Sequence, residues 1–213
     1  MPVFFETIID ENTRLGIWKI EESEDFFKNN VPLHRDVTHP HKRLQHLAGR
    51  FLLQYLFPSF PYELIRIADT RKPFLEDEQF HFSISHCGDY AAAIASRDRR
   101  VGIDVEIPVS KIGRIAEKFL DNEENKAFAI GKEQDEDSLG LTTILWSAKE
   151  SVFKWYGEGG VDFRKDIRLR KSREPGKIDC HFNKTGVDLV ISYRKFDHLV
   201  AAWVLSHPGN SSE

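Results

Sequence analysis

The stretch Ser138–Tyr156, SLGLTTILWSAKESVFKWY, predicts one long helix, and Gly157 directly after it is a typical helix terminator. Aromatic residues crowd more than one face of this helix, so we expect most of it to be buried. Its charged side chains then need partners, because an unpaired charge is costly away from water. Glu150 and Lys154 are four residues apart in the order that favours a surface ion pair, which is the simplest interpretation of these two.

Strands follow this helix, and a similar arrangement precedes it. Periodic apolar residues predict a second long helix over 38–57, with Pro40 in its first turn and Pro58 at its end. Ser23 is expected to cap a short helix, and Cys87, Gly88 and Asp89 suggest a turn. Further strands are expected at 3–9, 15–20, 64–67, 80–85, 90–95, 101–106, 167–169, 178–182, 187–193 and 199–205, and shorter helices at 112–119 and 123–130.

These elements predict an α+β fold built from two similar halves. Each half contains strands and one long helix, and each ends in an Ala-rich strand. We expect an N-terminal half at 1–100, a C-terminal half at 101–206 and a polar tail at 207–213, with an acidic loop at 131–137. The duplication has no repeated motif behind it, only a repeated order of elements.

Composition excludes several classes of protein. With 213 residues, 40% of them hydrophobic, the chain has enough apolar material for a globular core. Its longest apolar run, Leu199–Leu205, is far shorter than the roughly 20 residues of a membrane span, and the N-terminus does not resemble a signal peptide. Two cysteines are too few for a disulfide scaffold. We therefore expect a cytoplasmic protein without a membrane partner.

Charge is unevenly distributed along the chain. The formal net charge of −4 argues against broad binding of nucleic acid. Residues 117–137 nevertheless hold eight acidic and three basic residues, whereas 164–177 hold seven basic and two acidic ones. Such runs are most often solvated faces, but an enzyme that handles a polyanion through a metal ion would need the same combination.

Two short segments carry groups suited to chemistry. In the expected strand VGIDVE, 101–106, Asp104 and Glu106 project from one face, where two carboxylates would bind a hard cation such as Mg²⁺. The same pattern is also common at sheet edges. In FHFSISHC, 80–87, Ser85 and His86 offer a hydroxyl and an imidazole to a phosphate; adjacent residues of a strand do not suit a catalytic triad. The chain contains no Gly-rich phosphate loop, and His39, His41 and His46 lack a zinc spacing.

The order of these segments resembles the 4′-phosphopantetheinyl transferases, in their larger, monomeric, Sfp-type branch. The matching motifs are FSISH at 82–86, GIDVE at 102–106 and, about 40 residues later, WSAKESVFK at 146–154. KPFL at 72–75 resembles the family's G-K-P-x-L segment, and Ala48-Gly49-Arg50 also fits. Arg71 departs from the pattern, since the family has glycine there.

The resemblance implies a fold and an activity. Its fold has two similar α+β halves related by a pseudo-two-fold axis, with coenzyme A in the cleft between them. Its members are holo-[acyl-carrier-protein] synthases: they transfer the 4′-phosphopantetheine moiety of coenzyme A to a serine of an apo acyl or peptidyl carrier protein and release adenosine 3′,5′-bisphosphate. A monomer that uses Mg²⁺, or alternatively Mn²⁺, is expected.

The resemblance also implies roles for individual residues. Asp104, Glu106 and Glu150 would coordinate the metal, and Glu150 would also be the base for the carrier serine. Lys154 would neutralise charge on the diphosphate, as a catalytic and a coenzyme A-binding residue. The remaining residues expected at coenzyme A are Arg43, Arg50, Lys72, Pro73, Ser85, His86 and Lys149.

Two other functions fit parts of the sequence. A non-catalytic module of the same fold that binds coenzyme A or a carrier protein would be expected to lose the metal ligands, which are all present here. A Mg²⁺-dependent phosphodiesterase or nuclease would leave the Ser85-His86 and Lys72-Pro73 segments unexplained. Because carrier proteins are acidic, the basic residues of 164–177 are a hypothetical surface for receiving one.

Overall fold

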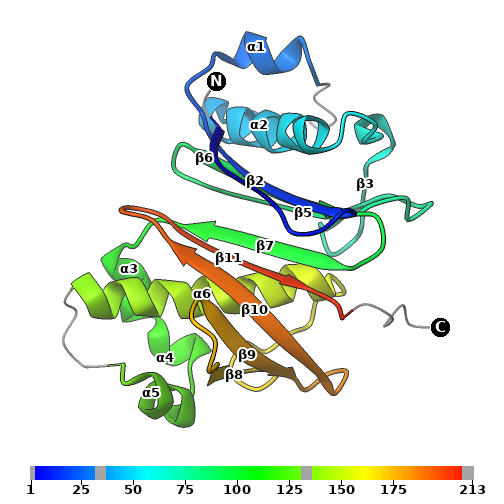
Figure 1. Cartoon of the computed structure of the whole chain (residues 1–213). Helices are drawn as coiled ribbons and strands as arrows, with labels where there is room; N and C mark the ends of the chain where they lie inside the picture. Colours follow the sequence, from blue (N-terminus) through cyan, green and yellow to red (C-terminus); the bar gives the residue numbers. More distant parts are fainter. Residues whose placement is uncertain (1–2, 32–36, 131–135, 208–213) are drawn as a thin grey trace. The chain divides into compact units, whose positions relative to one another are not determined.

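The computed structural model describes residues 3–31, 37–130 and 136–207 (Figure 1). The chain divides into two units, residues 1–101 and 102–213, each with an antiparallel sheet and one long helix. The prediction of a fold that mixes sheets with helices is confirmed. Nearly all of the expected tail, and most of the expected loop at 131–137, lie outside the described residues. Among the helices that the structure describes, none is long and apolar enough to cross a membrane.

The first unit contains a four-stranded sheet in the order β1-β2-β6-β5. Its strands are β1 (Val3–Ile8), β2 (Thr13–Lys19), β5 (His81–Cys87) and β6 (Tyr90–Ser96). A two-stranded sheet pairs β3 (Arg66–Ile67) with β4 (Pro73–Phe74), and the helices are α1 (Glu24–Lys28), α2 (Pro40–Leu56) and the 3-10 turn η1 (Tyr62–Leu64). The expected strand at 64–67 is therefore reduced to two residues, because the 3-10 turn occupies its start.

Small side chains let α2 lie close to this sheet. Every residue of β6, YAAAIAS, is buried, and α2 packs against β6 and β2. Gly49 sits where α2 meets β5: a Cβ atom there would stand 2.6 Å from Cγ2 of Ile84. The motif Ala48-Gly49-Arg50 thus includes a residue that the helix–sheet distance requires to be small.

The second unit contains a five-stranded sheet in the order β7-β11-β10-β9-β8. Its strands are β7 (Val101–Glu106), β8 (Ile167–Lys171), β9 (Lys177–Phe182), β10 (Val187–Lys195) and β11 (Val200–Leu205). Its helices are α3 (Ser110–Arg114), α4 (Ala116–Phe119), α5 (Asn122–Phe128) and α6 (Glu136–Tyr156). The single helix expected at 112–119 is thus two short ones; Ile115, with φ −102° and ψ 7°, interrupts the helical backbone beside Gly113.

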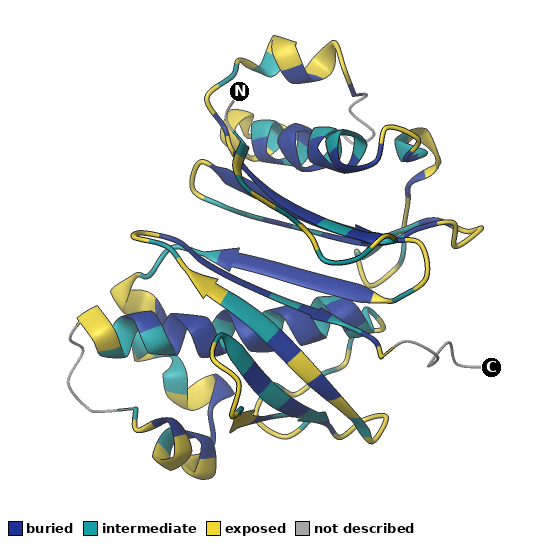
Figure 2. Cartoon of the chain, in the orientation of Figure 1, coloured by how far each residue is buried: buried dark blue, intermediate teal, exposed yellow. Residues whose placement is uncertain are grey.

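Helix α6 is buried along most of its length, as the sequence predicts (Figure 2). It packs against β11 and β10, and its backbone also lies close to the sheet's edge strand β7 at Gly102. A Cβ atom on Gly102 would lie 2.0 Å from the carbonyl oxygen of Ser151 and 2.6 Å from the amide nitrogen of Trp155. Strand alternation puts Asp104 and Glu106 on the same face of β7 as Gly102, and this face therefore meets α6.

Replacing Gly102 with alanine tests this contact. We expect Gly102→Ala to lower the free energy of unfolding by about 3 kcal/mol or more, because the added methyl group meets helix backbone that cannot move aside. Gly140→Ala in the same helix is the matched control: its Cβ would meet only the tip of the flexible Lys195 side chain, 3.0 Å from Nζ. Alanine there should be neutral or stabilise by up to about 1 kcal/mol. Urea unfolding of both variants measures the difference, and equal effects would contradict the account.

Candidate functional site

The ion pair between Asp104 and Lys154 joins β7 to α6. Asp104 is almost fully buried, at 3% exposure, and Lys154 donates from Nζ to its Oδ1 over 2.7 Å. Lys154 therefore pairs with a residue of β7. Helix spacing alone suggests a different partner, Glu150, one turn earlier on the same helix. Two residues that lie 50 positions apart in the sequence are brought into direct contact.

The fold makes the carboxyl of Glu150 a weaker acid than usual. The pKa of its carboxyl is raised to about 7: burial is the largest cause, the Asp104 and Glu106 carboxylates act in the same direction, and the Lys154 ammonium opposes them. The Asp104 and Glu106 carboxylates, which the family resemblance assigns to a metal together with Glu150, thus both act electrostatically on Glu150. A carboxyl with a pKa near neutrality can both hold and release a proton at working pH.

Trp146 links Glu106 to an aromatic groove. Its indole Nε1 donates to Glu106 Oε1 over 3.3 Å, and its ring packs against Phe119 and Phe163 at centroid distances of 5.0 and 5.6 Å. A groove of about 810 Å³ opens here beside Glu150. It is lined by Ile115, Lys118, Phe119, Trp146, Glu150, Phe153, Gly160, Val161, Asp162 and Phe163. Motif order did not predict this groove; the aromatic residues Trp146 and Phe153 on either side of Glu150 are the sequence signal for it.

Residues 100–204 match the family model of the 4′-phosphopantetheinyl transferase superfamily, with Asp104, Glu106, Glu150 and Lys154 inside the match. Residues 100–204 form a domain of this superfamily. The match covers the carboxylates, the lysine and the aromatic groove together, so the geometry above belongs to the superfamily domain.

Individual relatives agree with this assignment. Enterobactin synthase component D of Salmonella typhi is 32% identical over 120 residues, which are 55% of this chain and 49% of that protein. A protein of Haemophilus influenzae, described as a candidate 4′-phosphopantetheinyl transferase, is 29% identical over 167 residues, 75% of this chain and 66% of that protein. L-aminoadipate-semialdehyde dehydrogenase-phosphopantetheinyl transferase of Xenopus laevis is 30% identical over 132 residues. The chain spans about half the length of the enterobactin relative.

The superfamily domain positions Lys149 differently from the expectation that it contacts coenzyme A. Its side chain is fully buried, and its ammonium forms an ion pair with Glu124 of α5, with 2.7 Å between Nζ and Oε1. The same Nζ donates to the carbonyl oxygens of Phe163 and Ile167, each over 2.8 Å. Burial lowers the pKa of Lys149 and Glu124 opposes this. The prediction of a phosphate contact is therefore wrong for Lys149 in this geometry, because an ammonium has only three donors and all three face the protein interior.

In the first unit, Arg43 also has a structural partner. Its guanidinium donates to both carboxylate oxygens of Glu24 on α1, each over 2.8 Å, and to the carbonyl oxygen of Val37. The expected role of Arg43 at a phosphate conflicts with this arrangement, since the bidentate pair already fixes the guanidinium between α1 and α2. Arg50, about two turns further along α2, is half-buried.

Ser85 and His86 occupy the end of β5. Ser85 is buried, whereas His86 is half-buried and its ring meets that of His46 on α2, with 5.4 Å between centroids. No motif in the sequence assigns a role to His46. Lys72 and Pro73 are half-buried at the start of β4, and the preceding Arg71 has φ 68°. Arg71 thus adopts the left-handed conformation that the family glycine would accept more easily.

Mg²⁺ chemistry suits the donors in the superfamily domain. Within the parts of the chain that the structure describes, no three His, Cys, Asp or Glu side chains are arranged to hold a metal ion. However, the carboxylates of Asp104 and Glu106 both act on the buried Glu150 carboxyl, and among the described residues the Lys154 ammonium is the one positive group that opposes them there. Oxygen donors with excess negative charge are what a hard divalent cation prefers. The chemistry of Asp104, Glu106 and Glu150 therefore fits Mg²⁺.

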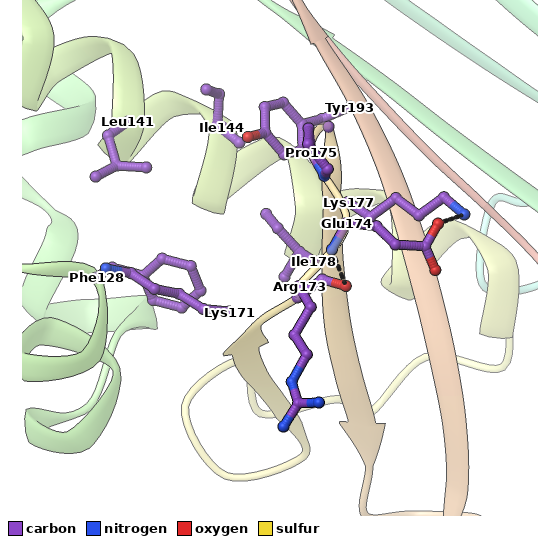
Figure 3. Close-up of a pocket in the computed structure, with 12 residues that line it drawn as sticks. Phe128, Leu141, Ile144, Lys171, Arg173, Glu174, Pro175, Lys177, Ile178 and Tyr193 are labelled. Atoms are coloured by element: carbon purple, nitrogen blue, oxygen red, sulfur yellow. Dashed lines mark hydrogen bonds and ion pairs between the residues drawn. The ribbon is translucent and has the colours of Figure 1, made fainter.

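The basic segment 164–177 borders a second pocket, of about 390 Å³, between α6 and the turn that joins β8 to β9 (Figure 3). Phe128, Leu141 and Ile144 form an apolar side, and Lys171, Arg173 and Lys177 come from the turn and its flanking strands. Only part of the positive charge is balanced locally: Lys177 pairs with Glu174, and Arg168 pairs with Glu123 over 2.8 Å. Within the described residues, the structure shows no ion pair for Arg170, Lys171 or Arg173.

The pKa of Glu150 predicts a pH dependence of stability. Since the folded-state pKa is about 7 and the ordinary value is 4.5, the protonated carboxyl stabilises the fold below about pH 4.5, and this contribution is lost as the pH rises through about 7. The difference in unfolding free energy between the natural protein and Glu150→Gln should fall over this range by up to about 3 kcal/mol. Urea unfolding in metal-free buffer measures it. Asp197→Asn, at an exposed position, should show no such change, and a flat difference for Glu150→Gln would contradict the assignment.

Proposed function

We propose that the protein is a 4′-phosphopantetheinyl transferase: it moves the phosphopantetheine moiety of coenzyme A to a serine of an apo acyl or peptidyl carrier protein and releases adenosine 3′,5′-bisphosphate. The observation that carries the proposal is the position of Glu150. In the superfamily domain it combines a pKa of about 7 with two neighbouring carboxylates and the Lys154 ammonium. The names of the relatives from Haemophilus influenzae and Xenopus laevis support the same reaction.

The reaction needs a base and a group that stabilises the leaving phosphate. The serine oxygen forms a bond to the phosphorus that carries pantetheine, while the bond from that phosphorus to the bridging oxygen of the pyrophosphate breaks. Glu150 takes the serine proton, which its pKa permits near neutral pH. Lys154 offsets the negative charge that builds up on the leaving adenosine bisphosphate. Asp104 holds Lys154 in place through the 2.7 Å ion pair.

Three carboxylates of the superfamily domain would hold a divalent ion, Mg²⁺ or Mn²⁺: those of Asp104, Glu106 and Glu150. When bound, such an ion neutralises pyrophosphate charge and polarises the phosphorus for attack. The hydrogen bond from Trp146 then orients Glu106, and burial keeps Asp104 from swinging into solvent.

Coenzyme A would be recognised at its nucleotide end by residues of the first unit. Ser85, His86, Lys72 and Pro73 remain the candidates, with Arg50 from α2. Because Arg43 is held by Glu24, we replace it in this role with His46, whose ring already meets that of His86. Two imidazoles in contact offer donors to a phosphate when they are protonated.

A carrier protein would approach the second unit along its basic segment. Arg170, Lys171 and Arg173 are exposed there, and the groove beside Glu150 offers aromatic surface for apolar side chains of the partner. Acidic partners are steered to such cations over a range that salt shortens. The Sfp-type branch, a monomeric state and a cytoplasmic location complete the proposal.

Transfer can be tested directly by intact mass. Incubation with coenzyme A, Mg²⁺ and several apo carrier proteins should add one phosphopantetheine group to at least one of them. Asp104→Asn and Glu150→Gln preserve shape and should each lower kcat at least about 100-fold, since each removes a charge from the reacting centre. Asp197→Asn, an exposed change of the same kind, should retain full activity.

A carrier that stays unmodified in every case, while coenzyme A still binds, would favour the alternative function of a non-catalytic binding module. If Glu150→Gln transferred at a near-normal rate, Glu150 would not be the base.

Charge reversal tests the approach of the carrier. Arg170→Glu, Lys171→Glu and Arg173→Glu together should lower kcat/KM for the carrier about tenfold or more at low salt, because electrostatic steering is reversed. The dissociation constant for coenzyme A should stay the same, and the effect should shrink at high salt. A value of kcat/KM that is unchanged at low salt would remove this surface from the proposal.

A further inference from the structure

Lys149 and Glu124 form a buried ion pair at the edge of the second unit's sheet. Their side chains are 0% and 2% exposed. β8 is the last strand in the sheet, so its outer backbone groups have no neighbouring strand to bond with. The pair replaces that strand: Lys149 donates to the carbonyl oxygen of Ile167 over 2.8 Å, and Glu124 accepts from the amide of Leu169 over 2.9 Å. This explains why a charged pair is buried here.

A further hydrogen bond of Lys149 extends toward the aromatic groove. Its ammonium donates to the carbonyl oxygen of Phe163 over 2.8 Å. The Phe163 ring packs against Trp146 at 5.6 Å and against Phe153 at 5.7 Å between centroids. These three aromatic residues line the groove beside Glu150. The buried ammonium therefore fixes the backbone that places the Phe163 ring between two residues of α6.

Trp146 connects Phe163 with the carboxylate of Glu106. Its ring contacts Phe163, and its indole Nε1 donates to Glu106 Oε1 over 3.3 Å. Three successive contacts thus connect the ammonium of Lys149 with the carboxylate of Glu106, and all of them lie within the second unit.

We infer that Lys149 is a positioning residue: by holding Phe163, and through Phe163 the indole of Trp146, it sets the orientation of the Glu106 carboxylate. The consequence for transfer rests on the proposed function, whereas the effect on the position of Trp146 does not. Glu124 acts one step further back, because its carboxylate balances the Lys149 charge and accepts the amide hydrogen bonds of Asp121 and Leu169.

The geometric part is tested by NMR of the four tryptophan indole groups. In Lys149→Met, measured well below its unfolding temperature, the Trp146 indole signal should shift, because Phe163 has lost its anchor. The Trp18 signal, from the first unit, should not move. Ser206→Ala is the matched control: it removes the buried hydrogen bond of the Trp155 indole, 3.0 Å long, and should shift the Trp155 signal but not that of Trp146.

A second variant keeps the test decisive if Lys149→Met does not fold. Lys149→Met combined with Glu124→Gln removes both charges, and neutral replacements of a buried pair are tolerated better than the loss of one partner. The Trp146 signal should shift in this variant as well. A Trp146 signal that stays in place in a folded protein without the Lys149 ammonium would overturn the inference.

Kinetics separate positioning from stability. Folded Lys149→Met should lose about tenfold or more in kcat, because small displacements of reacting groups are costly, while KM for coenzyme A changes by less than about threefold. Ser206→Ala should lose stability without this loss of kcat. A normal kcat in a variant whose Trp146 signal has moved would also overturn the role in transfer. If the natural protein transfers nothing, the proposed function fails, and the NMR result still decides the geometry.

Discussion

The close backbone contact between β7 and α6 at Gly102 is the constraint on which the rest of the second unit depends. Because residue 102 has no side chain, the strand lies directly against the helix backbone at Ser151 and Trp155. Strand alternation then turns Asp104 and Glu106 toward the same helix, where Lys154 and Trp146 bond to them. The raised pKa of Glu150 follows first from its burial and then from the nearby Asp104 and Glu106 carboxylates, which disfavour a further negative charge.

The two lysines of the α6 motif, Lys149 and Lys154, have different partners. Lys154 bonds to Asp104 on β7, while Lys149, five residues earlier and therefore on a different face, bonds to Glu124 and to the edge strand β8. Lys154 thus lies among the carboxylates of the candidate site, whereas Lys149 stabilises the surrounding fold. Aromatic side chains connect the two lysine sites: the backbone of Phe163 accepts a hydrogen bond from Lys149, and the Phe163 ring packs against Trp146.

Much of this fold could be predicted from local patterns. Apolar periodicity and proline positions located α2, and strand alternation located β7 with its correct bounds. The interaction partners of charged side chains could not be predicted from these local patterns. Arg43 meets Glu24, 19 residues away, and Lys149 meets Glu124, 25 residues away, because tertiary packing brings other elements beside them. A motif identifies which residues matter, whereas burial and neighbours decide whether a lysine faces a ligand or the interior.

The pKa of Glu150 measured with and without Mg²⁺ tests the central claim most directly. Carbon-13 NMR of the glutamate carboxyl groups, with Glu150→Gln for assignment, gives this value in the folded protein. The account predicts a pKa of about 7 without metal and a clear decrease when Mg²⁺ is added, because the ion balances the charges of Asp104, Glu106 and Glu150. An ordinary pKa near 4.5 without metal, or a value that Mg²⁺ leaves unchanged, would contradict it.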